Sequence, residues 1–309
     1  MANRPQFSLT LVTFAADDPG DWSHLAARAE VADAAGVDRL AVSDHVAFGA
    51  DLADYGDPSR GGISGGRQPT GPDGPWLEPL TVIAHLTART QTVRFGTNIL
   101  LAALRRPVVL AKTASTIDVL SGGRLDLGVG VGWQAAEYDA AGLSFGDRGA
   151  QLDHTLAVCH ALWAGNDVAF ADERLRFDGI WQEPKPSAGA VPVWVSGTTN
   201  PRAMRRLARF GSGWIPWGPD AADLPAGIDK MREAVATHDR DPGEIGVVGS
   251  LPTQRRDDGA PDVRATMAAV PALVEAGVTD FRSNFRLGDD PAQAEQLAAL
   301  VDGFRAASA

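Results

Sequence analysis

Hydrophobic residues follow two alternating patterns along the chain. Short apolar runs of the kind that form buried strands lie at residues 7–14, 38–42, 93–101, 125–131, 191–196, 213–217, 245–251 and 279–284. Each run is followed by a stretch in which apolar residues recur every three or four positions, which is the spacing of one helix face. Because strand and helix alternate eight times, the pattern predicts a (β/α)8 TIM barrel, with a doubly wound open sheet as the alternative.

Individual residues predict where several of these helices begin and end. Asp21 is expected to cap the first helix, and Gly36 to close it. Pro79 and Pro107 each suit the first position of a helix, and Gly122 follows the helix that Pro107 opens. The boundaries agree with the alternating pattern.

Two segments interrupt the alternation. Residues 46–76 are rich in Gly, Pro, Asp and Ser, which predicts a long surface loop with the character of a lid. This loop contains G-x-S-x-G at 62–66, but it lacks the strand and helix that a serine nucleophile elbow requires, so a hydrolase is disfavoured. Residues 165–190 are expected to form an insertion between the fourth helix and the fifth strand, with a small hairpin. We predict one barrel domain over residues 1–309.

The fourth strand ends in closely spaced glycines. Gly128, Gly130 and Gly132 remove side chains from the end of the run GGRLDLGVGVGWQAAEY, so a ligand can approach the backbone there. A dinucleotide fingerprint would need a glycine at the position of Trp133, which disfavours a Rossmann fold. A tight turn without any ligand is the structural alternative.

Loops that follow the strands of such a barrel share one face, where barrel enzymes carry their active sites. This brings together His45, the segment Thr97-Asn98-Ile99, the glycines and the turn Ser196-Gly197-Thr198-Thr199. The turn precedes a helix, whose free N–H groups can bind phosphate, although Ser and Thr are also ordinary helix caps. Three arginines at 202, 205 and 206 could add counter-charge.

Asp44 and His45 are the pair at a strand end with acid–base character. Imidazole titrates near neutral pH, and a neighbouring carboxylate can orient it. The alternative is a loop-capping Asp beside a structural His. The other histidines show no metal-ligand spacing, so we predict no metal site.

Composition excludes several classes of function. The net charge of −11 disfavours nucleic acid as a partner, because such binding relies on clustered Lys and Arg. No apolar run is long enough to cross a membrane, and no secretion signal is apparent, so we expect a cytoplasmic location and no membrane partner. Cys159 is the single cysteine and falls in a helical pattern, which predicts a buried, inert thiol.

Several motifs, loose individually but in a specific order, resemble the bacterial luciferase-like monooxygenase superfamily, and most of all its coenzyme F420-dependent oxidoreductase branch. They are SDH at 43–45, WLEP at 76–79, FGTNIL at 95–100 with RRP at 105–107, GGRLDLGVGVGW at 122–133 with Glu137, and EPKP at 183–186 before VPVWVSG. The resemblance spans essentially the whole chain. Some other branches of this superfamily use FMN.

The resemblance implies a luciferase-like barrel with F420, or alternatively FMN, at the carboxyl ends of its strands. It implies that His45 handles a proton near the reactive face of the ring, and that Asn98 and Ile99 carry a non-proline cis peptide behind the ring. It also implies a set of cofactor-binding residues: Asp44, Thr97, Asn98, Ile99, Gly130, Gly132, Ser196, Gly197, Thr198 and Thr199. Trp133 replaces the glutamate of the sugar-phosphate dehydrogenase branch, so Trp133 and Trp76 are expected to contact substrate.

The expected function is hydride transfer between bound coenzyme F420 and a small organic substrate. One alternative is an FMN-dependent monooxygenase that receives reduced flavin from a partner reductase. Another is a catalytically silent flavin-binding protein, and a third is a phosphate-binding lyase. The lyase would need a buried lysine, whereas Lys112, Lys185 and Lys230 fall in helix or connector patterns. We expect a homodimer, as relatives often form.

Overall fold

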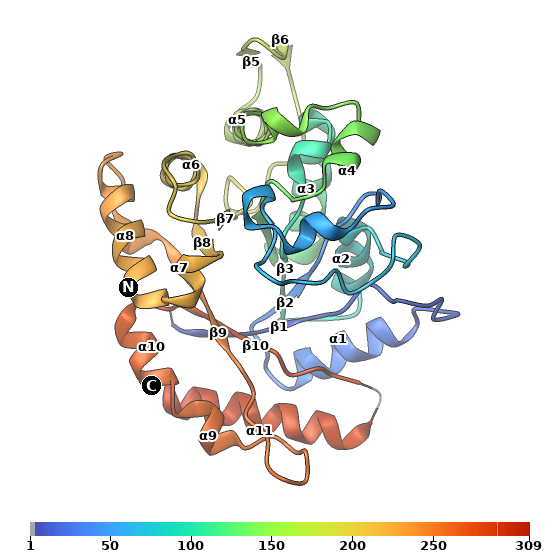
Figure 1. Cartoon of the computed structure of the whole chain (residues 1–309). Coiled ribbons are helices and arrows are strands. Elements are labelled where there is room, and N and C mark those ends of the chain that lie inside the picture. The colour runs from blue at the N-terminus through green and yellow to red at the C-terminus, as the bar shows by residue number, and fades with distance from the viewer. Residues whose placement is uncertain (1–3, 289) are drawn as a thin grey trace.

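Eight parallel strands close into a barrel within residues 4–288 and 290–309, the part of the chain that the computed structural model describes (Figure 1). Hydrogen-bonded neighbours follow the order β1, β2, β3, β4, β7, β8, β9, β10, after which β10 returns to β1. The strands are β1 (Gln6–Thr10), β2 (Arg39–Val42), β3 (Arg94–Thr97), β4 (Leu125–Val129), β7 (Val193–Gly197), β8 (Gly213–Pro216), β9 (Gly246–Leu251) and β10 (Asp280–Ser283). This confirms the predicted (β/α)8 barrel over the open sheet.

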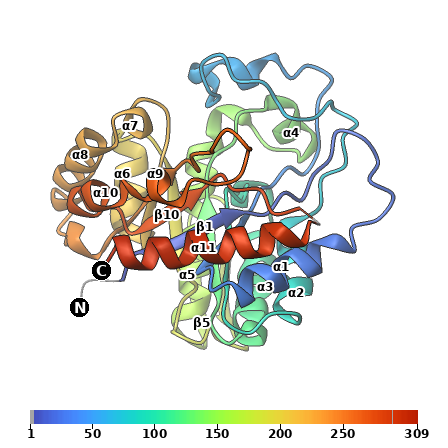
Figure 2. The same cartoon turned by 90° about the horizontal axis from the view of Figure 1, so that it is seen from below.

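Helices surround the barrel on the outside (Figures 1 and 2). The longer ones are α1 (His24–Ala34), α2 (Pro79–Thr87), α3 (Pro107–Ser121), α5 (Arg148–Ala164), α6 (Pro201–Phe210), α8 (Leu224–Ala236), α10 (Val270–Ala276) and α11 (Pro291–Ala307). The shorter ones are α4 (Ala135–Ala140), α7 (Pro219–Ala222) and α9 (Val263–Met267). Over the described residues, no helix combines the length and apolar character that a membrane crossing requires.

The helix boundaries agree with the sequence at most positions and differ at one. Pro79 and Pro107 occupy the first positions of α2 and α3, and Gly122 caps α3 in the left-handed conformation with φ of 69°. The predicted cap at Asp21 is wrong, because α1 begins at His24 after Ser23. The Asp21 carboxylate instead accepts hydrogen bonds from the backbone N–H and the hydroxyl of Ser23.

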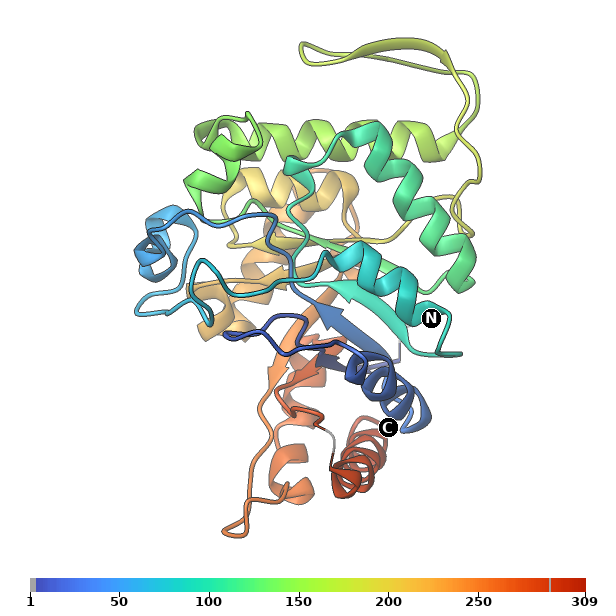
Figure 3. The same cartoon turned by 90° about the vertical axis from the view of Figure 1, so that its right-hand side faces the viewer.

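The insertion between α5 and β7 forms the predicted hairpin. Its strands, β5 (Val168–Ala171) and β6 (Arg176–Ile180), pair antiparallel. Figure 3 shows this hairpin extending well away from the barrel as an arm. Phe170 and Phe177 stack across the two strands with ring centroids 5.7 Å apart, which gives the arm a small apolar contact of its own.

A network of buried charges lies at the amino ends of the strands, opposite the face that carries active sites in such barrels. Arg39 of β2 is 4% exposed, and its guanidinium bonds to the carboxylates of Asp126 on β4 and Asp280 on β10. Arg94 also pairs with Asp126, and Ser8 donates a hydrogen bond to Asp280. Burial disfavours the charge on Arg39, but the two carboxylates outweigh it and raise the pKa of Arg39. The network therefore joins three strands through one cation.

Cys159 lies inside α5 and is 1% exposed. Burial raises the pKa of its thiol to about 12, so the thiol stays protonated near neutral pH. This confirms the prediction of a buried, inert thiol.

Asp33 of α1 holds the segment that leads into β3. Its carboxylate accepts hydrogen bonds from the backbone N–H groups of Gln91, Thr92 and Val93, and one from the Thr92 hydroxyl, at 2.6 to 2.9 Å. Burial opposes the ionised form, but these bonds outweigh it and lower the pKa of Asp33. A folded-state pKa below the unfolded value means that the carboxylate stabilises the fold above about pH 4, and that this contribution is lost as the pH falls further.

We expect Asp33→Ala to lower the free energy of unfolding at pH 7 by about 1 kcal/mol, in the range of a lost helix cap, because three backbone donors lose their acceptor. Urea denaturation between pH 3 and 7 measures this, and the difference from wild type should shrink toward the acid end. Asp229→Ala is the matched control, because Asp229 is exposed and its ion pair to Arg232 is 3.8 Å long. A difference that grows as the pH falls would contradict the role of Asp33.

Candidate active site

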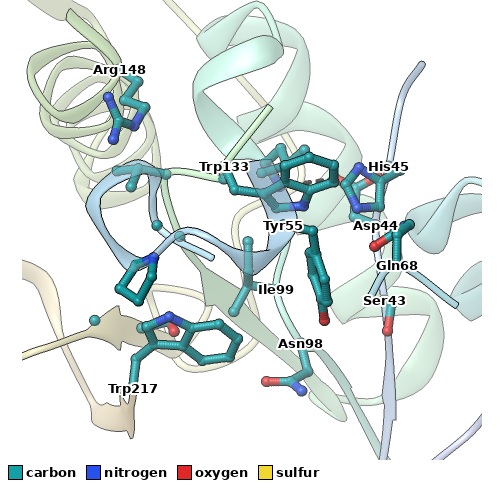
Figure 4. Close-up of a pocket in the computed structure, with 18 of the residues that line it drawn as sticks. Ser43, Asp44, His45, Tyr55, Gln68, Asn98, Ile99, Trp133, Arg148 and Trp217 are labelled. Carbon is teal, nitrogen blue, oxygen red and sulfur yellow. Dashed lines mark hydrogen bonds between the residues drawn. The ribbon is translucent and has the colours of Figure 1, made fainter. Parts of the chain in front are cut away.

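A cavity of about 430 Å³ opens at the carboxyl ends of β2, β3, β4 and β7, which is a typical size for a small-molecule site (Figure 4). Segments far apart in the sequence meet around it, as the barrel prediction required. The predicted site residues among its lining are Asp44, His45, Trp76, Asn98, Ile99, Gly130, Gly132, Trp133, Ser196, Gly197 and Thr198. Two predicted residues, Thr97 and Thr199, are absent from that lining. Thr97 is 2% exposed and donates its hydroxyl hydrogen bond to the Gly128 carbonyl at 2.7 Å, so it holds β3 against β4.

His45 is held by a glutamate that the sequence did not assign to the site. The His45 Nδ1 atom lies 3.3 Å from Oε2 of Glu137, which is 2% exposed. The other oxygen, Oε1, accepts hydrogen bonds from the backbone N–H groups of Val46 at 2.5 Å and Ala47 at 3.3 Å. Because a carboxylate oxygen accepts, this contact requires a proton on Nδ1 of the imidazole. The Nε2 atom is then the ring nitrogen that can exchange a proton with a ligand.

The short helix α4 supplies this support. This helix contains Glu137, and Gln134 directly precedes it. The side-chain oxygen of Gln134 accepts a hydrogen bond from the backbone N–H of Gly49 at 3.0 Å. The start of the 46–76 loop is therefore bound to α4, and the two lie side by side in Figures 1 and 2. A helix of six residues is too short for its periodicity to be recognised in the sequence. The signal that could have identified Glu137 was its place in the glycine-rich motif.

Aromatic side chains surround the imidazole. Ring centroids of Phe48, Trp76 and Trp133 lie 4.4, 4.8 and 5.8 Å from that of His45. Trp76 also stacks on Phe14 at 4.1 Å, which ties the end of the loop to the segment after β1. Apolar walls of this kind exclude water from a proton-handling group and favour an organic ligand.

The 46–76 loop contributes part of the cavity wall. Tyr55 packs edge-on against Trp133 with centroids 5.3 Å apart, and Figure 4 shows its side chain extending into the cavity. Gly61 approaches the glycine-rich strand end closely, because a Cβ atom at Gly61 would lie 3.1 Å from the Gly132 carbonyl oxygen. Gly61 also has φ of 102°, a conformation that favours glycine. The loop thus covers part of the cavity.

The carboxylate of Asp44 is bonded to neighbouring protein groups and is not free. Its oxygens accept hydrogen bonds from the Leu101 N–H at 2.8 Å and from both terminal nitrogens of Arg105 at 2.6 and 3.1 Å. Burial opposes the charge on Arg105, but the carboxylates of Asp44 and Glu78 outweigh it and raise the pKa of Arg105. Asp44 therefore fixes the end of β2 to the segment after β3, with His45 next to it in the chain.

The peptide bond between Asn98 and Ile99 is cis, as the resemblance implied. Ile99 packs on the glycine-rich strand end, since a Cβ atom at Gly130 would lie 2.9 Å from its side chain. A Cβ atom at Gly132 would lie 2.7 Å from Leu101. The missing side chains of these glycines thus accommodate neighbouring residues, while the backbone of both glycines still lines the cavity.

The turn before α6 has several of its hydrogen-bond donors already in use. The Thr199 N–H and hydroxyl both donate to the carboxylate of Asp220, at 2.7 and 3.1 Å. The Asn200 side chain caps α6 by accepting from two backbone N–H groups at 3.1 Å. Arg206 pairs with Asp153 at 2.6 Å and is 5% exposed, so it adds no free charge to the turn.

The cavity fits a planar, polar-edged ring system such as a flavin or deazaflavin. Its walls are largely aromatic and aliphatic, and three lining residues carry buried donors without a protein partner: Trp133 through Nε1, Gln68 through Nε2 and Arg148 through Nε. Unpaired buried donors are costly unless a ligand accepts from them. Over the described residues, no group of three His, Cys, Asp or Glu side chains is arranged to hold a metal ion.

Comparisons with known proteins agree with this geometry. The family model for luciferase-like monooxygenases matches residues 6–302. An F420-dependent glucose-6-phosphate dehydrogenase of Nakamurella multipartita is 30% identical over 279 residues, which cover 87% of this chain and 75% of that protein. The fold is similar to that of an F420-dependent secondary alcohol dehydrogenase in complex with an F420-acetone adduct, at a TM-score of 0.75 and 16% identity over 98% of this chain and 99% of that one.

The similar folds include a monooxygenase as well. The EDTA monooxygenase of Chelativorans has a TM-score of 0.71 and 13% identity, over 97% of this chain and 94% of that one. At this level of identity these likenesses show the fold alone. The match of the family model over nearly the whole barrel, with the relative at 30% identity, shows that the chain belongs to the luciferase-like monooxygenase family.

Proposed function

We propose that this protein transfers hydride between bound coenzyme F420 and a small organic substrate. The observation that carries the proposal is the contact between His45 and Glu137 at the wall of the aromatic cavity. It gives a histidine one fixed tautomer, a defined orientation and low exposure to water. The relative of Nakamurella multipartita, named an F420-dependent enzyme, supports F420 as the cofactor.

Each part of the site has a role in this reaction. Coenzyme F420 supplies the hydride-transfer chemistry when it is bound. His45 holds or delivers a proton through Nε2 while Glu137 keeps Nδ1 protonated. Trp133 and Gln68 offer their unpaired N–H groups to acceptors on the edge of a ring. The loop from 46 to 76 limits the access of water.

Trp133 narrows the class of substrate. The related glucose-6-phosphate dehydrogenase acts on a sugar phosphate, and the resemblance to that branch implies a glutamate at the position of Trp133. An indole N–H donates a hydrogen bond but is neither a base nor an acid near neutral pH, so it cannot take the proton of a sugar hydroxyl, and we do not propose sugar-phosphate oxidation. The aromatic wall of Trp133, Tyr55 and Trp76 instead suits a small alcohol, ketone or unsaturated carbonyl compound with an apolar body.

Fluorescence titration of the purified protein with F420 and with FMN tests the cofactor. We expect micromolar binding of F420 and much weaker binding of FMN. Trp133→Ala should weaken F420 binding, because it removes a cavity wall, whereas Trp181→Ala should leave it unchanged, because Trp181 is 66% exposed and absent from the lining of the cavity. Tight binding of FMN alone would replace the proposal with an FMN-dependent monooxygenase. Binding of F420 without turnover of any alcohol or carbonyl compound in a panel would indicate a silent binding protein.

A further inference from the structure

Arg148, the first residue of α5, supplies a positive charge at the cavity wall. Its guanidinium carbon lies 3.8 Å from the ring centroid of Phe145, and its Nη1 donates to the Phe145 carbonyl at 2.9 Å. Figure 4 places Arg148 at the edge of the cavity, away from His45. Stacking on Phe145 fixes the plane of the guanidinium, which orients its remaining N–H groups.

Much of the hydrogen-bonding capacity of Arg148 is unused. Its Nε atom is buried without a partner, and its Nη2 makes one long bond of 3.4 Å to the Arg60 carbonyl. Within residues 4–288 and 290–309, no carboxylate forms an ion pair with it. The neighbouring acids have other partners, since Asp147 pairs with Arg174, and Asp54 pairs with Arg60 at 3.2 Å. Burial, together with the charge of Arg60, lowers the pKa of Arg148.

The other candidate for an anion site is less favourable. Two donors of Thr199 in the turn before α6 bond to Asp220, which is itself 5% exposed. Lys230 pairs with Asp220 at 3.7 Å, and the Lys230 side chain is 62% exposed. A phosphate at this turn would face a buried negative charge. The charge distribution around the cavity therefore favours an anion at Arg148.

We propose that Arg148 is the binding site for an oxyanion group, a phosphate or a carboxylate, on a ligand of this cavity. The fork of the guanidinium matches two oxygens of such a group, and the group would pair the orphaned Nε donor. The anion belongs either to the side chain of the cofactor, since both F420 and FMN carry a phosphate, or to the substrate. The inference deepens the proposed function and rests on it for the identity of the ligand.

Binding measurements with paired ligands distinguish these sources. One pair is F420 and its ribityl deazaflavin precursor, which has the same deazaflavin ring but no phosphate. If the anion is the cofactor's, Arg148→Gln should weaken F420 binding by about 10- to 100-fold, the range of a lost charged hydrogen bond, and should leave binding of the ribityl precursor unchanged. Arg148→Lys should show a smaller loss, because it keeps the charge without the fork.

If the anion is the substrate's, Arg148→Gln should leave F420 binding unchanged. Inorganic phosphate or benzoate should then raise the melting temperature of the F420-loaded wild-type protein, but not that of loaded Arg148→Gln. Arg202→Gln is the matched control, because Arg202 is exposed beside the turn before α6. Arg202→Gln should match wild type in every arm.

The proposal is overturned if Arg148→Gln folds with a melting temperature near that of wild type and behaves as wild type in both tests. It would then bind both members of the cofactor pair as tightly, and the two anions would raise its melting temperature as much. It is equally overturned if Arg202→Gln alone loses F420 binding, because the anion then lies at the turn. Failure of the proposed function gives a different result, in which neither F420 nor its ribityl precursor binds wild type. The anion arm still tests Arg148 in that case, through inorganic phosphate added to wild type and to Arg148→Gln without cofactor.

Discussion

Replacing His45 with alanine is expected to lower turnover by about 100- to 10,000-fold, the usual contribution of a positioned general acid or base. The Kd of the cofactor should change little, because the imidazole contacts Phe48, Trp76 and Trp133 and forms only one side of the cavity. Stopped-flow measurement of F420 oxidation or reduction gives the rate, using the first alcohol or carbonyl compound that a panel screen identifies. Fluorescence titration gives the Kd for the same preparation.

Two variants of α4 show whether the effect depends on the orientation of the histidine. Glu137→Gln removes the charge next to His45 Nδ1 but retains an oxygen for the Val46 N–H, so turnover should fall less than in His45→Ala. Gln134→Ala removes only the bond to the Gly49 N–H and serves as the control, with turnover near that of wild type. Equal losses of turnover and cofactor affinity in His45→Ala would show that the residue binds the cofactor and has no proton-handling role.

Arg39→Met is expected to have the largest effect on stability, about 3 to 5 kcal/mol in the free energy of unfolding. The substitution leaves Asp280 and Asp126 buried without their shared cation, and breaking one side of a buried ion pair typically costs this much. Arg282 compensates little, since its guanidinium lies 3.7 Å from Asp280. Urea denaturation at pH 7 measures the change.

Arg94→Met is the matched control for this variant. Arg94 pairs with Asp126 at 2.8 Å but its side chain is 28% exposed, so its loss should cost less than that of Arg39. If Arg39→Met does not fold, the double variant Arg39→Met with Asp280→Asn should recover part of the stability, because one uncompensated charge is removed. Equal losses of unfolding free energy in Arg39→Met and Arg94→Met would show that burial of the charge network adds no stability beyond that of a partly exposed ion pair.

The order of elements could be predicted from the sequence because each strand of the barrel is apolar enough to be recognised. The hydrophobic pattern did not predict which polar residues are buried. Asp126 occupies a polar position in the alternation of β4, yet all five residues of that strand are buried, since a parallel barrel strand has a covered outer face as well as a packed interior. Its charge is balanced by Arg39, which lies 87 positions away in the sequence, so no local pattern could indicate it.

The site was predictable in position and less so in its polar partners. The sequence identified His45 and Trp133 because each follows the end of a strand, and the carboxyl ends of parallel strands lie on one face of the barrel. Glu137, Asp220 and Arg148 required the structure, since their roles depend on which donors and charges meet across the cavity. The assignment of Thr199 shows the same limit. A hydroxyl and a free N–H before a helix suit a phosphate, but here a distant carboxylate already accepts from both.

The bonds from α4 to the backbone of residues 46, 47 and 49 divide the loop into a fixed base and a variable remainder. The base directly follows His45, and the remainder, from Leu52 to Pro69, supplies walls of the cavity such as Tyr55 together with one donor, the Gln68 side chain. Insertions or exchanges in the remainder can therefore reshape the substrate side without disturbing the orientation of the imidazole. A loop transplant between members of the family that keeps Gln134 and Glu137 would alter substrate preference while retaining the same proton-transfer apparatus.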